Sequence, residues 1–316
     1  MGDSDSFSVQ YVGQNYDIRE FLRNHPGGVN YVQAYEDRDV TQKMLDMHHS
    51  KAAFYLLREY KIGGRDLKRN EHTDDLEDLV DWNKPMLRQV VNLGEKYYEW
   101  VNSPVDRHMT LFGNQILENL TITPWYVVPL IWIPVSFYLI YLGSIKQLET
   151  SYNILNIIGA VGLGVLLWTL LEYSLHRWVF HIVPSGKSKI VICIHFTIHG
   201  LHHKVPFDSR RLVFPPFPAA LIVMLGYYFY WNTFPENVYE LIGGGTILGY
   251  VLYDMVHFYI HHGNPNEGSY LYIMKRYHNH HHFSHHEAGF GISSQLWDFV
   301  FGTVIRLKKL AMGIRW

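Results

Sequence analysis

Fifteen of the twenty histidines lie between His176 and His286, and they form four tight groups. Imidazole is a ligand for zinc, copper, iron and nickel, and such close spacing aims several rings at one point. The groups therefore predict a metal centre. They read HRWVFH at 176–181, HFTIHGLHH at 195–203, HFYIHH at 257–262 and HNHHHFSHH at 278–286.

The spacing within the groups indicates which rings can share a face. His257 and His261 are four residues apart, and two groups repeat the pattern HxxHH, so a helix would place the rings of each set on one side. His176 and His181 are five residues apart, which fits the end of a helix better than its interior. The sets together contain ten candidate ligands: His176, His181, His199, His202, His203, His257, His261, His278, His281 and His282.

The number of candidate ligands bears on the number of metals. One metal takes roughly four to six ligands, so ten imidazoles suit two metals, each with a position left for water or oxygen. Ligand type alone does not choose between zinc and iron. The other histidines of these groups are expected to contact ligands or solvent, because ligating imidazoles usually bond through their second nitrogen. They are His195, His262, His280, His285 and His286.

The chain becomes apolar after residue 118, in four stretches of nearly bilayer-spanning length. Tryptophan and tyrosine near their ends are typical of interfacial anchors. The alternative is a buried core helix, above all for the third stretch with its prolines and for the fourth, which Gly243-Gly244-Gly245 interrupts. That glycine run favours close helix packing, or else an acyl groove. The stretches are 125–143, 154–171, 213–231 and 238–260.

Charge predicts the orientation. The loops 176–211 and 275–315 are rich in lysine and arginine, whereas 144–153 and 232–237 hold one lysine, so the histidine groups are expected on the cytosolic side of the membrane. The net charge of −2 gives no reason to expect nucleic acid as a partner. Cys193 is the only cysteine, which excludes an intramolecular disulfide.

The first third of the chain is polar. We expect one domain at 1–64, a connector at 65–118 and a membrane domain at 119–316. Within the connector, apolar residues recur at roughly helical spacing over 87–101, which predicts one amphipathic helix, either on a membrane surface or packed against a domain.

Residues 7–64 resemble the cytochrome b5-like haem-binding domain. The resemblance rests on Tyr16-Asp17, Phe21, His25-Pro26-Gly27-Gly28 and His49-Ser50. It implies an α+β fold with haem b held between His25 and His49, with His48 as the alternative second ligand. Pro26 and the two glycines can turn the chain sharply and let the backbone approach a flat cofactor. Because two histidines fill both axial positions of the iron, such a haem would only pass electrons.

An electron carrier fused to a polyhistidine membrane domain indicates redox chemistry, which favours iron over redox-inert zinc. The whole chain resembles the fatty acid 2-hydroxylases of the membrane fatty acid hydroxylase superfamily. The motifs that carry the resemblance are LVDWNKPMLRQVVNLGEKYYEWVNSPV, EYSLHRWVFH, HFTIHGLHH, YDMVHFYIHH, KRYHNHHHF and GFGISSQLWDFVFGT.

This second resemblance implies an oxidoreductase, a monooxygenase that hydroxylates C2 of a long-chain fatty acid or a ceramide acyl chain for sphingolipid synthesis. It assigns the ten histidines to two irons, which zinc can displace in purified samples. Dioxygen, a pyridine-nucleotide-dependent reductase and membrane lipid are the expected partners. The expected location is the endoplasmic reticulum membrane, with about four spanning helices, and with the haem domain and a histidine-rich helical cap in the cytosol.

Two other classes of function stay open. One is a related histidine-box sterol or lipid desaturase or oxidase, and the other is a membrane-tethered haem electron carrier with structural zinc. For a hydroxylase, a cation could hold the carboxyl or amide end of the substrate at a fixed distance from the metals. Arg177, Lys204, Arg210 and Arg211 are the candidates, although positive charges on the cytosolic side serve equally as interfacial residues.

Overall fold

The computed structural model describes residues 6–63, 75–150 and 153–307. The beginning of the expected connector, at 65–74, lies outside the described residues. So do Lys308, Lys309 and Arg315, three of the charges on which the expected orientation depends.

The N-terminal domain combines one hairpin with short helices, as the α+β expectation requires. Strands β1 (Ser8–Tyr11) and β2 (Gln14–Asp17) pair antiparallel, with Val9 opposite Tyr16. Val12 and Gly13 between them both have positive φ, the geometry of a tight two-residue turn. The helices are η1 (Leu22–Asn24), α1 (Asn30–Gln33), α2 (Thr41–Asp46), α3 (Lys51–Leu57) and η2 (Arg58–Tyr60). Phe7, Val9, Tyr16, Ile18 and Val40 form the buried core.

The connector contains short elements in place of the single amphipathic helix expected over 87–101. That expectation was wrong: α4 (Leu87–Val90) ends at Val90, and η4 (Gly94–Lys96) and α5 (Tyr97–Val101) follow. Gly94 has a φ of 60°, a left-handed backbone conformation that interrupts a continuous α-helix and that a periodicity of apolar residues does not reveal. The other elements of this part are η3 (Leu76–Leu79) and α6 (Gln115–Leu120).

The connector packs against protein, which decides between the two alternatives left open for it. Tyr97, Trp100 and Val101 are fully buried in a core that they share with Ile192 and Phe196. Those two residues belong to a continuous helical segment in the second half of the chain. Its parts are α9 (Lys189–His195), the π-helical turn η6 (Phe196–Gly200) and α10 (Leu201–Lys204).

Two cations expected as possible substrate anchors hold this region together instead. Lys204 is fully buried, with Nζ 2.6 Å from both Oε1 of Glu77 and the carbonyl of Ser103. Arg211 is buried and pairs with Glu118, whose carboxylate also accepts the backbone N–H of Leu111. Because a buried charge that loses its partner is costly, both cations are committed to structural ion pairs.

Three helices among the described residues are long and apolar enough to span a membrane. They are α7 (Val127–Thr150), α8 (Ile154–Leu175) with the turn that follows it, and α12 (Tyr239–His262). The third apolar stretch forms α11 (Pro216–Thr233), which is 18 residues long and exposes Phe217, Leu225 and Phe229. The count of four spanning helices stays a prediction.

The central helix is α12, which packs on α7, α8 and α11. Glycines let these helices approach closely. A Cβ on Gly164 of α8 would lie 2.2 Å from the carbonyl oxygen of Ile242, and one on Gly245 would lie 2.2 Å from that of Val161. Both positions therefore exclude any side chain, as in tightly packed membrane helices.

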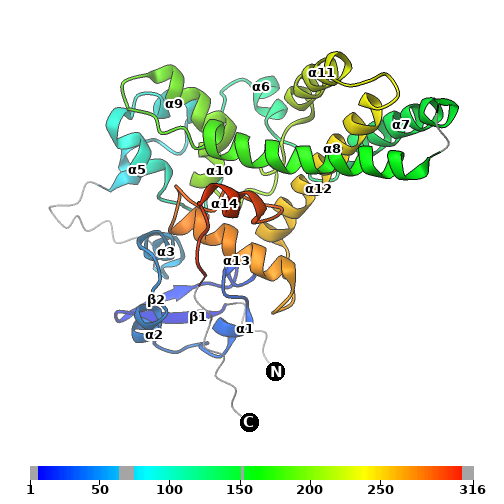
Figure 1. The fold of residues 1–316 in the computed structure, drawn as a ribbon. Coiled ribbons are helices and arrows are strands. Elements are labelled where there is room, and N and C mark those ends of the chain that lie inside the picture. The colour runs from blue at the N-terminus through cyan, green and yellow to red at the C-terminus, as the bar shows by residue number, and fades with distance from the viewer. Residues whose placement is uncertain (1–5, 64–74, 151–152, 308–316) are drawn as a thin grey trace, which may run out of the picture.

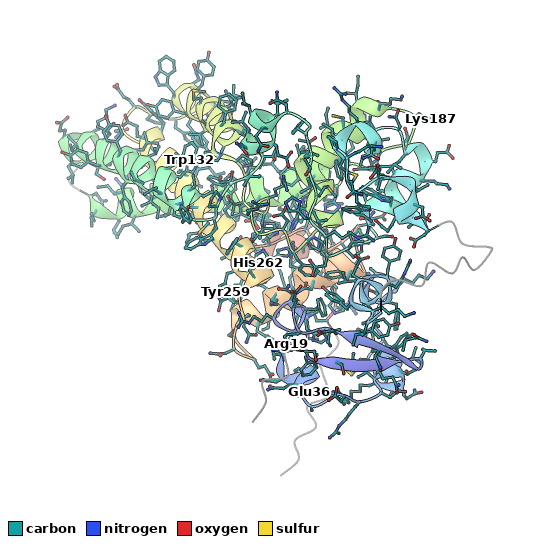
Figure 2. All side chains as sticks on the ribbon, turned by 180° about the vertical axis from the view of Figure 1, so that it is seen from behind. Arg19, Glu36, Trp132, Lys187, Tyr259 and His262 are labelled. Carbon is teal, nitrogen blue, oxygen red and sulfur yellow. The ribbon has the colours of Figure 1, made fainter. Side chains whose placement is uncertain are left out.

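The remaining helices, α13 (Tyr270–Phe283) and α14 (Leu296–Phe301), lie between the apolar helices and the N-terminal domain (Figure 1). From behind, Tyr259 and His262 at the end of α12 lie between Trp132 of α7 and Arg19 of the N-terminal domain (Figure 2). The end of α12 that carries His257 and His261, the helix α13 and the N-terminal domain thus lie on the same side of the apolar helices (Figure 1).

Candidate metal centre

A π-helical turn brings the first pair of histidines together. Helix α8 continues into η5 (His176–Phe180), where the N–H of His181 donates to the carbonyl of His176, 3.1 Å away. This five-residue bond closes a wider turn, so residues five apart fall on the same side. The sequence spacing pointed to a helix terminus, and His181 does cap the helical segment.

Four histidines, His176, His181, His199 and His281, form the first cluster, with one nitrogen of each within 4.8 Å of the others. His181 is at its centre, with Nε2 3.2 Å from that of His176 and 2.9 Å from that of His281. His199 comes from the second π-helical turn, η6. Nε2 of His203 lies 3.0 Å from that of His199, at the edge of this cluster.

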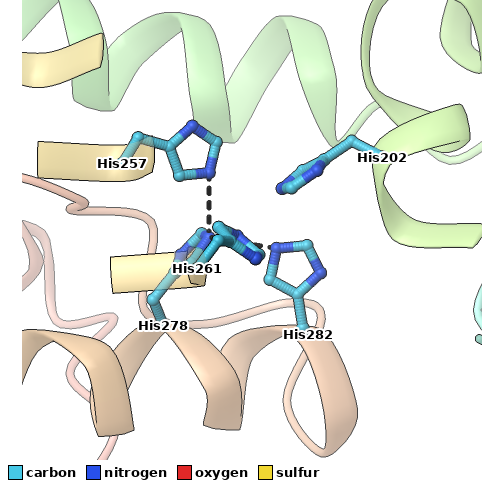
Figure 3. A group of neighbouring side chains, drawn as sticks. All are labelled: His202, His257, His261, His278 and His282. Atoms are coloured by element: carbon cyan, nitrogen blue, oxygen red, sulfur yellow. Dashed lines mark hydrogen bonds between the residues drawn. The ribbon is translucent and has the colours of Figure 1, made fainter. Parts of the chain in front are cut away.

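The second cluster contains His202, His257, His261, His278 and His282, all buried (Figure 3). Here Nε2 of His278 is central, 3.0 Å from that of His257, 2.9 Å from that of His261 and 3.0 Å from that of His282. His202 faces them from α10, with its ring centroid 4.6 Å from that of His261.

All ten expected ligands thus lie together, but each HxxHH set is divided between the clusters. In one set His199 belongs to the first cluster and His202 to the second; in the other His281 belongs to the first, and His278 and His282 to the second. The sequence indicated that the rings of each set share one side of a helix, but not that they divide between two clusters. The clusters adjoin, because the rings of His203 and His282 stack at 4.3 Å.

Burial keeps these imidazoles neutral. It lowers the pKa of His199, His202, His203, His278 and His282 well below the usual 6.5, and neighbouring imidazolium charges would lower the pKa further. A neutral imidazole offers a lone pair, which a metal requires. Within the described residues the buried Nε2 of His202 has no hydrogen-bond partner, an arrangement that costs about 1–3 kcal/mol unless a ligand satisfies it. The donor set therefore fits two metal ions.

The loop 288–293 orients two ligands of the first cluster. Nδ1 of His176 donates to the carbonyl of Phe290 at 2.6 Å, and Nδ1 of His281 to that of Ala288 at 2.8 Å, so both Nε2 atoms are free for a metal. Two buried carboxylates hold the loop. Asp298 accepts the N–H groups of Phe290 and Gly291 at 2.9 and 2.8 Å.

The second of these carboxylates is Glu172 of α8. It accepts the N–H groups of Ile292 and Ser293 and the hydroxyl of Ser293, at 2.6 to 2.9 Å. Sequence reasoning missed both Glu172 and Asp298. Their signal would have been an acidic residue within the apolar stretch 154–175 and another within the apolar run LWDFVF.

The two candidate haem ligands, His25 and His49, face each other in the N-terminal domain. The ring centroids of His25 and His49 are 6.2 Å apart. Nδ1 of His25 lies 3.3 Å from the carbonyl of Gly28, and Nδ1 of His49 lies 2.9 Å from that of Met44, so each Nε2 is left for the iron. Burial and the charge of His49 lower the pKa of His25 to about 4. His25 is therefore a neutral donor, and the two rings face each other in a geometry that fits a haem.

The residues next to His25 and His49 explain the glycines of the HPGG motif and the serine of the HS motif. A Cβ on Gly27 would lie 3.0 Å from Cε1 of His25, and Gly28 has a φ of 90°, so both positions favour glycine. Ser50 caps α3 by accepting the N–H of Ala53. His48 is exposed with a φ of 52°, whereas His49 faces His25.

The five histidines of these groups that are not candidate ligands contact different neighbouring residues. Nδ1 of His195 lies 2.5 Å from the hydroxyl of Tyr97, and burial lowers the pKa of His195 to about 4. The ring of His286 lies 5.7 Å from that of His203, and His280 stacks on His285. His262 packs on Phe258. None of the five belongs to either cluster as the described residues define them.

An almost wholly apolar cavity of about 300 Å³ leads from the clusters between α8, α11 and α12. Phe180 and Tyr253 line its end next to the clusters. Phe180 stacks on His199 of the first cluster at 5.2 Å, and Tyr253 stacks on His257 of the second at 5.8 Å. Two of the residues that line the cavity thus contact one histidine of each cluster.

The N-terminal domain contacts the helix that carries three of the ten histidines. The hydroxyl of Tyr272 on α13 donates to the carbonyl of Gly27 at 3.2 Å, and Nζ of Lys275 donates to those of Arg23 and Gly263 at 3.3 and 2.8 Å. The loop that carries His25 thus lies directly on α13, one to two turns before His278.

Two family models match the chain. Residues 161–303, which include all ten histidines, match the model of fatty acid hydroxylases, and residues 3–66 match that of the cytochrome b5-like haem/steroid binding domain. The second match includes both His25 and His49.

Known proteins match over most of the chain. A fatty acid 2-hydroxylase from Mus musculus is 41% identical, with 92% of this chain and 89% of the relative covered. A ceramide very long chain fatty acid hydroxylase from Saccharomyces cerevisiae is 33% identical, over 92% and 88%. A solved structure described as full-length scs7p, with only the hydroxylase domain visible, has a TM-score of 0.66 at 34% identity and covers 74% of this chain and 90% of that one.

Proposed function

The chain belongs to the fatty acid 2-hydroxylases, a family of oxidoreductases, and we propose that it hydroxylates C2 of a long acyl chain at a dimetal centre held by its ten clustered histidines. The substrate is a free long-chain fatty acid or the acyl group of a ceramide, and the product serves 2-hydroxy sphingolipid synthesis. The observation that carries the proposal is the apolar cavity whose lining residues Phe180 and Tyr253 stack on one histidine of each cluster.

The first cluster with His203 holds one metal, and the second cluster holds the other. Neutral, buried imidazoles and the partnerless Nε2 of His202 support this assignment. Two iron ions, when bound, supply the activation of dioxygen and the insertion of one oxygen atom into the C–H bond at C2. Loop 288–293 keeps His176 and His281 in the tautomer that presents Nε2.

The cavity walls place the reacting carbon of the acyl chain next to the metals. Phe180 and Tyr253 stack on one histidine of each cluster, so a chain that passes between them meets both metals. The apolar lining holds the tail and excludes water, which protects the reacting carbon from competing chemistry. Arg177 and Arg210 remain as cations for the carboxyl or amide end, since Lys204 and Arg211 are used in buried ion pairs.

The N-terminal domain supplies electrons. His25 and His49, whose Nδ1 atoms point to backbone carbonyls, would hold haem b, and a bound haem would supply one-electron transfer. The contact of Gly27 with Tyr272 keeps the haem domain on the helix that bears His278, His281 and His282. A pyridine-nucleotide-dependent reductase delivers the electrons to the haem, and dioxygen is the second substrate.

The enzyme resides in the endoplasmic reticulum membrane, with the haem domain and the metal centre in the cytosol. The excess of lysine and arginine in 176–211 over the opposite loops supports this orientation. It also gives a cytosolic reductase access to the haem domain.

Product analysis tests the proposal in cells that lack 2-hydroxy lipids. We expect 2-hydroxy acyl lipids with the wild type and with His280→Ala, whose ring lies outside both clusters, and none with His25→Ala or His278→Ala. A wild type without product, or an active His278→Ala variant, would overturn the assignment. Bound zinc in preparations whose haem is reducible but which consume no oxygen with acid and reductase would instead favour an electron carrier with structural zinc.

A further inference from the structure

The far end of the cavity lies at the glycine run of α12. Leu139, Tyr227, Tyr230 and Gly243 line that end. Gly243 precedes Tyr253 by ten residues on the same helix, which corresponds to roughly 15 Å along the axis at 1.5 Å per residue. The cavity therefore extends along α12 from the metal centre toward the opposite side of the apolar layer.

The three glycines of this run differ in what a side chain would meet. A Cβ on Gly244 would lie 2.9 Å from the carbonyl oxygen of Ser136, and one on Gly245 would lie 2.2 Å from that of Val161, so helix packing excludes side chains there. A Cβ on Gly243 would lie 3.8 Å from side-chain atoms of both Leu139 and Tyr230, which is ordinary contact. Packing explains two of the three glycines and leaves the third unexplained.

We propose that Gly243, with Tyr230 opposite it, sets the upper limit on the length of the acyl chain that the enzyme hydroxylates. The inference rests on the proposed function and adds a determinant of specificity to it. Without a side chain at 243 the tail extends to the end of the cavity, and a side chain there would occupy the space between Leu139 and Tyr230. Tyr230 is fixed because its hydroxyl lies 3.1 Å from Oγ1 of Thr246.

The test is the chain-length profile of the 2-hydroxy products. Wild type, Gly243→Ala and Gly243→Leu are compared in cells that lack 2-hydroxy lipids and are fed fatty acids of graded length. We expect Gly243→Leu to lower the ratio of longest to shortest product roughly tenfold, since a hydrophobic pocket discriminates by about that much per group added or removed. Gly243→Ala should shift the ratio in the same direction by less, with short-chain activity retained.

Gly162→Leu is the matched control. Gly162 lies on α8, is exposed, and has no atom within 4 Å of an added Cβ, so the same substitution there should leave the profile unchanged. An unchanged profile in both Gly243 variants overturns the inference, and so does an equal loss at every chain length. Absence of 2-hydroxy products from the wild type would instead overturn the proposed function, so the two failures are distinguishable.

Discussion

The haem pair and the first histidine cluster use the same device over different distances in the sequence. In both, a backbone carbonyl accepts the Nδ1 proton and leaves Nε2 for a metal. For His25 and His49 the carbonyl is three and five residues away, inside the same turn. For His176 it is that of Phe290, 114 residues away, and two buried carboxylates hold it in place.

This difference means that the candidate haem site depends on its own small domain, whereas the proposed dimetal site depends on the packing of the whole C-terminal part. Two ligands of the second cluster lack even a long-range support of this kind. Nδ1 of His278 and of His282 has no hydrogen-bond partner within the described residues, so the packing of the surrounding helices positions these rings. We expect the two kinds of site to be lost independently, and the loss of a long-range support to weaken metal binding at the proposed dimetal site.

The largest expected effect is a separate loss of each cofactor. His25→Ala should abolish the haem absorbance of the purified protein and leave the metal content at two ions per chain, because no cluster residue contacts His25 in the described structure. His278→Ala should keep the haem spectrum and lose at least one metal ion, because its Nε2 lies within 3.0 Å of three others. Visible spectroscopy and elemental analysis measure both.

His48→Asn is the control for the haem site. Asparagine tolerates the positive φ of 52° at this position, so the variant should fold and bind haem like the wild type. Loss of haem absorbance in His48→Asn with retention in His49→Ala would assign the second axial position to His48. Loss of both cofactors in His25→Ala would show that the two sites are not independent.

The local nature of the haem site explains why its residues could be read from the sequence. HPGG and HS each occupy one turn, and the glycines and the serine cap act within three residues of the ligand. The ten clustered histidines were also visible, since their spacing and number require no knowledge of packing. Three of the four apolar stretches lie in helices long and apolar enough to span a membrane.

The remaining features depend on contacts that no local pattern contains. The division of His199 and His202 between clusters follows from a π-helical turn next to a short α-helix, and apolar periodicity does not distinguish such a turn. The break at Gly94 likewise interrupts a regular apolar pattern. Lys204 looked like a free cation because its partner Glu77 is 127 residues away.

A smaller effect is expected from the support of the first cluster. Asp298→Asn keeps the size of the side chain but replaces one acceptor oxygen with an N–H₂ group, so one of the N–H groups of Phe290 and Gly291 loses its acceptor. The loop then shifts its carbonyls away from His176 and His281. Loss of such supporting residues typically lowers metal affinity about 10- to 100-fold. Metal retained after a graded chelator challenge measures the change.

The same preparation provides an internal control, since Asp298→Asn should leave the haem spectrum intact. Glu172→Gln should act in the same direction, because Glu172 holds the next two N–H groups of the loop. If chelators remove metal from both variants and from the wild type at the same concentration, the long-range support has no role in metal binding, and the contrast with the haem site disappears.

The smallest effect is expected where the two regions meet. Tyr272→Phe removes one hydrogen bond, to the carbonyl of Gly27, between the haem loop and α13. A neutral hydrogen bond contributes about 1 kcal/mol, which corresponds to roughly a fivefold change in the docking equilibrium. We expect reoxidation of the reduced haem, after addition of oxygen and fatty acid, to slow by about that factor in stopped-flow measurements, with unchanged haem and metal content.

Tyr259→Phe on α12, a tyrosine that is 41% exposed, is the matched control and should reoxidise like the wild type. Equal rates in all three proteins would mean that electrons reach the dimetal centre without this contact, and the two sites would then be independent in electron transfer as well as in assembly.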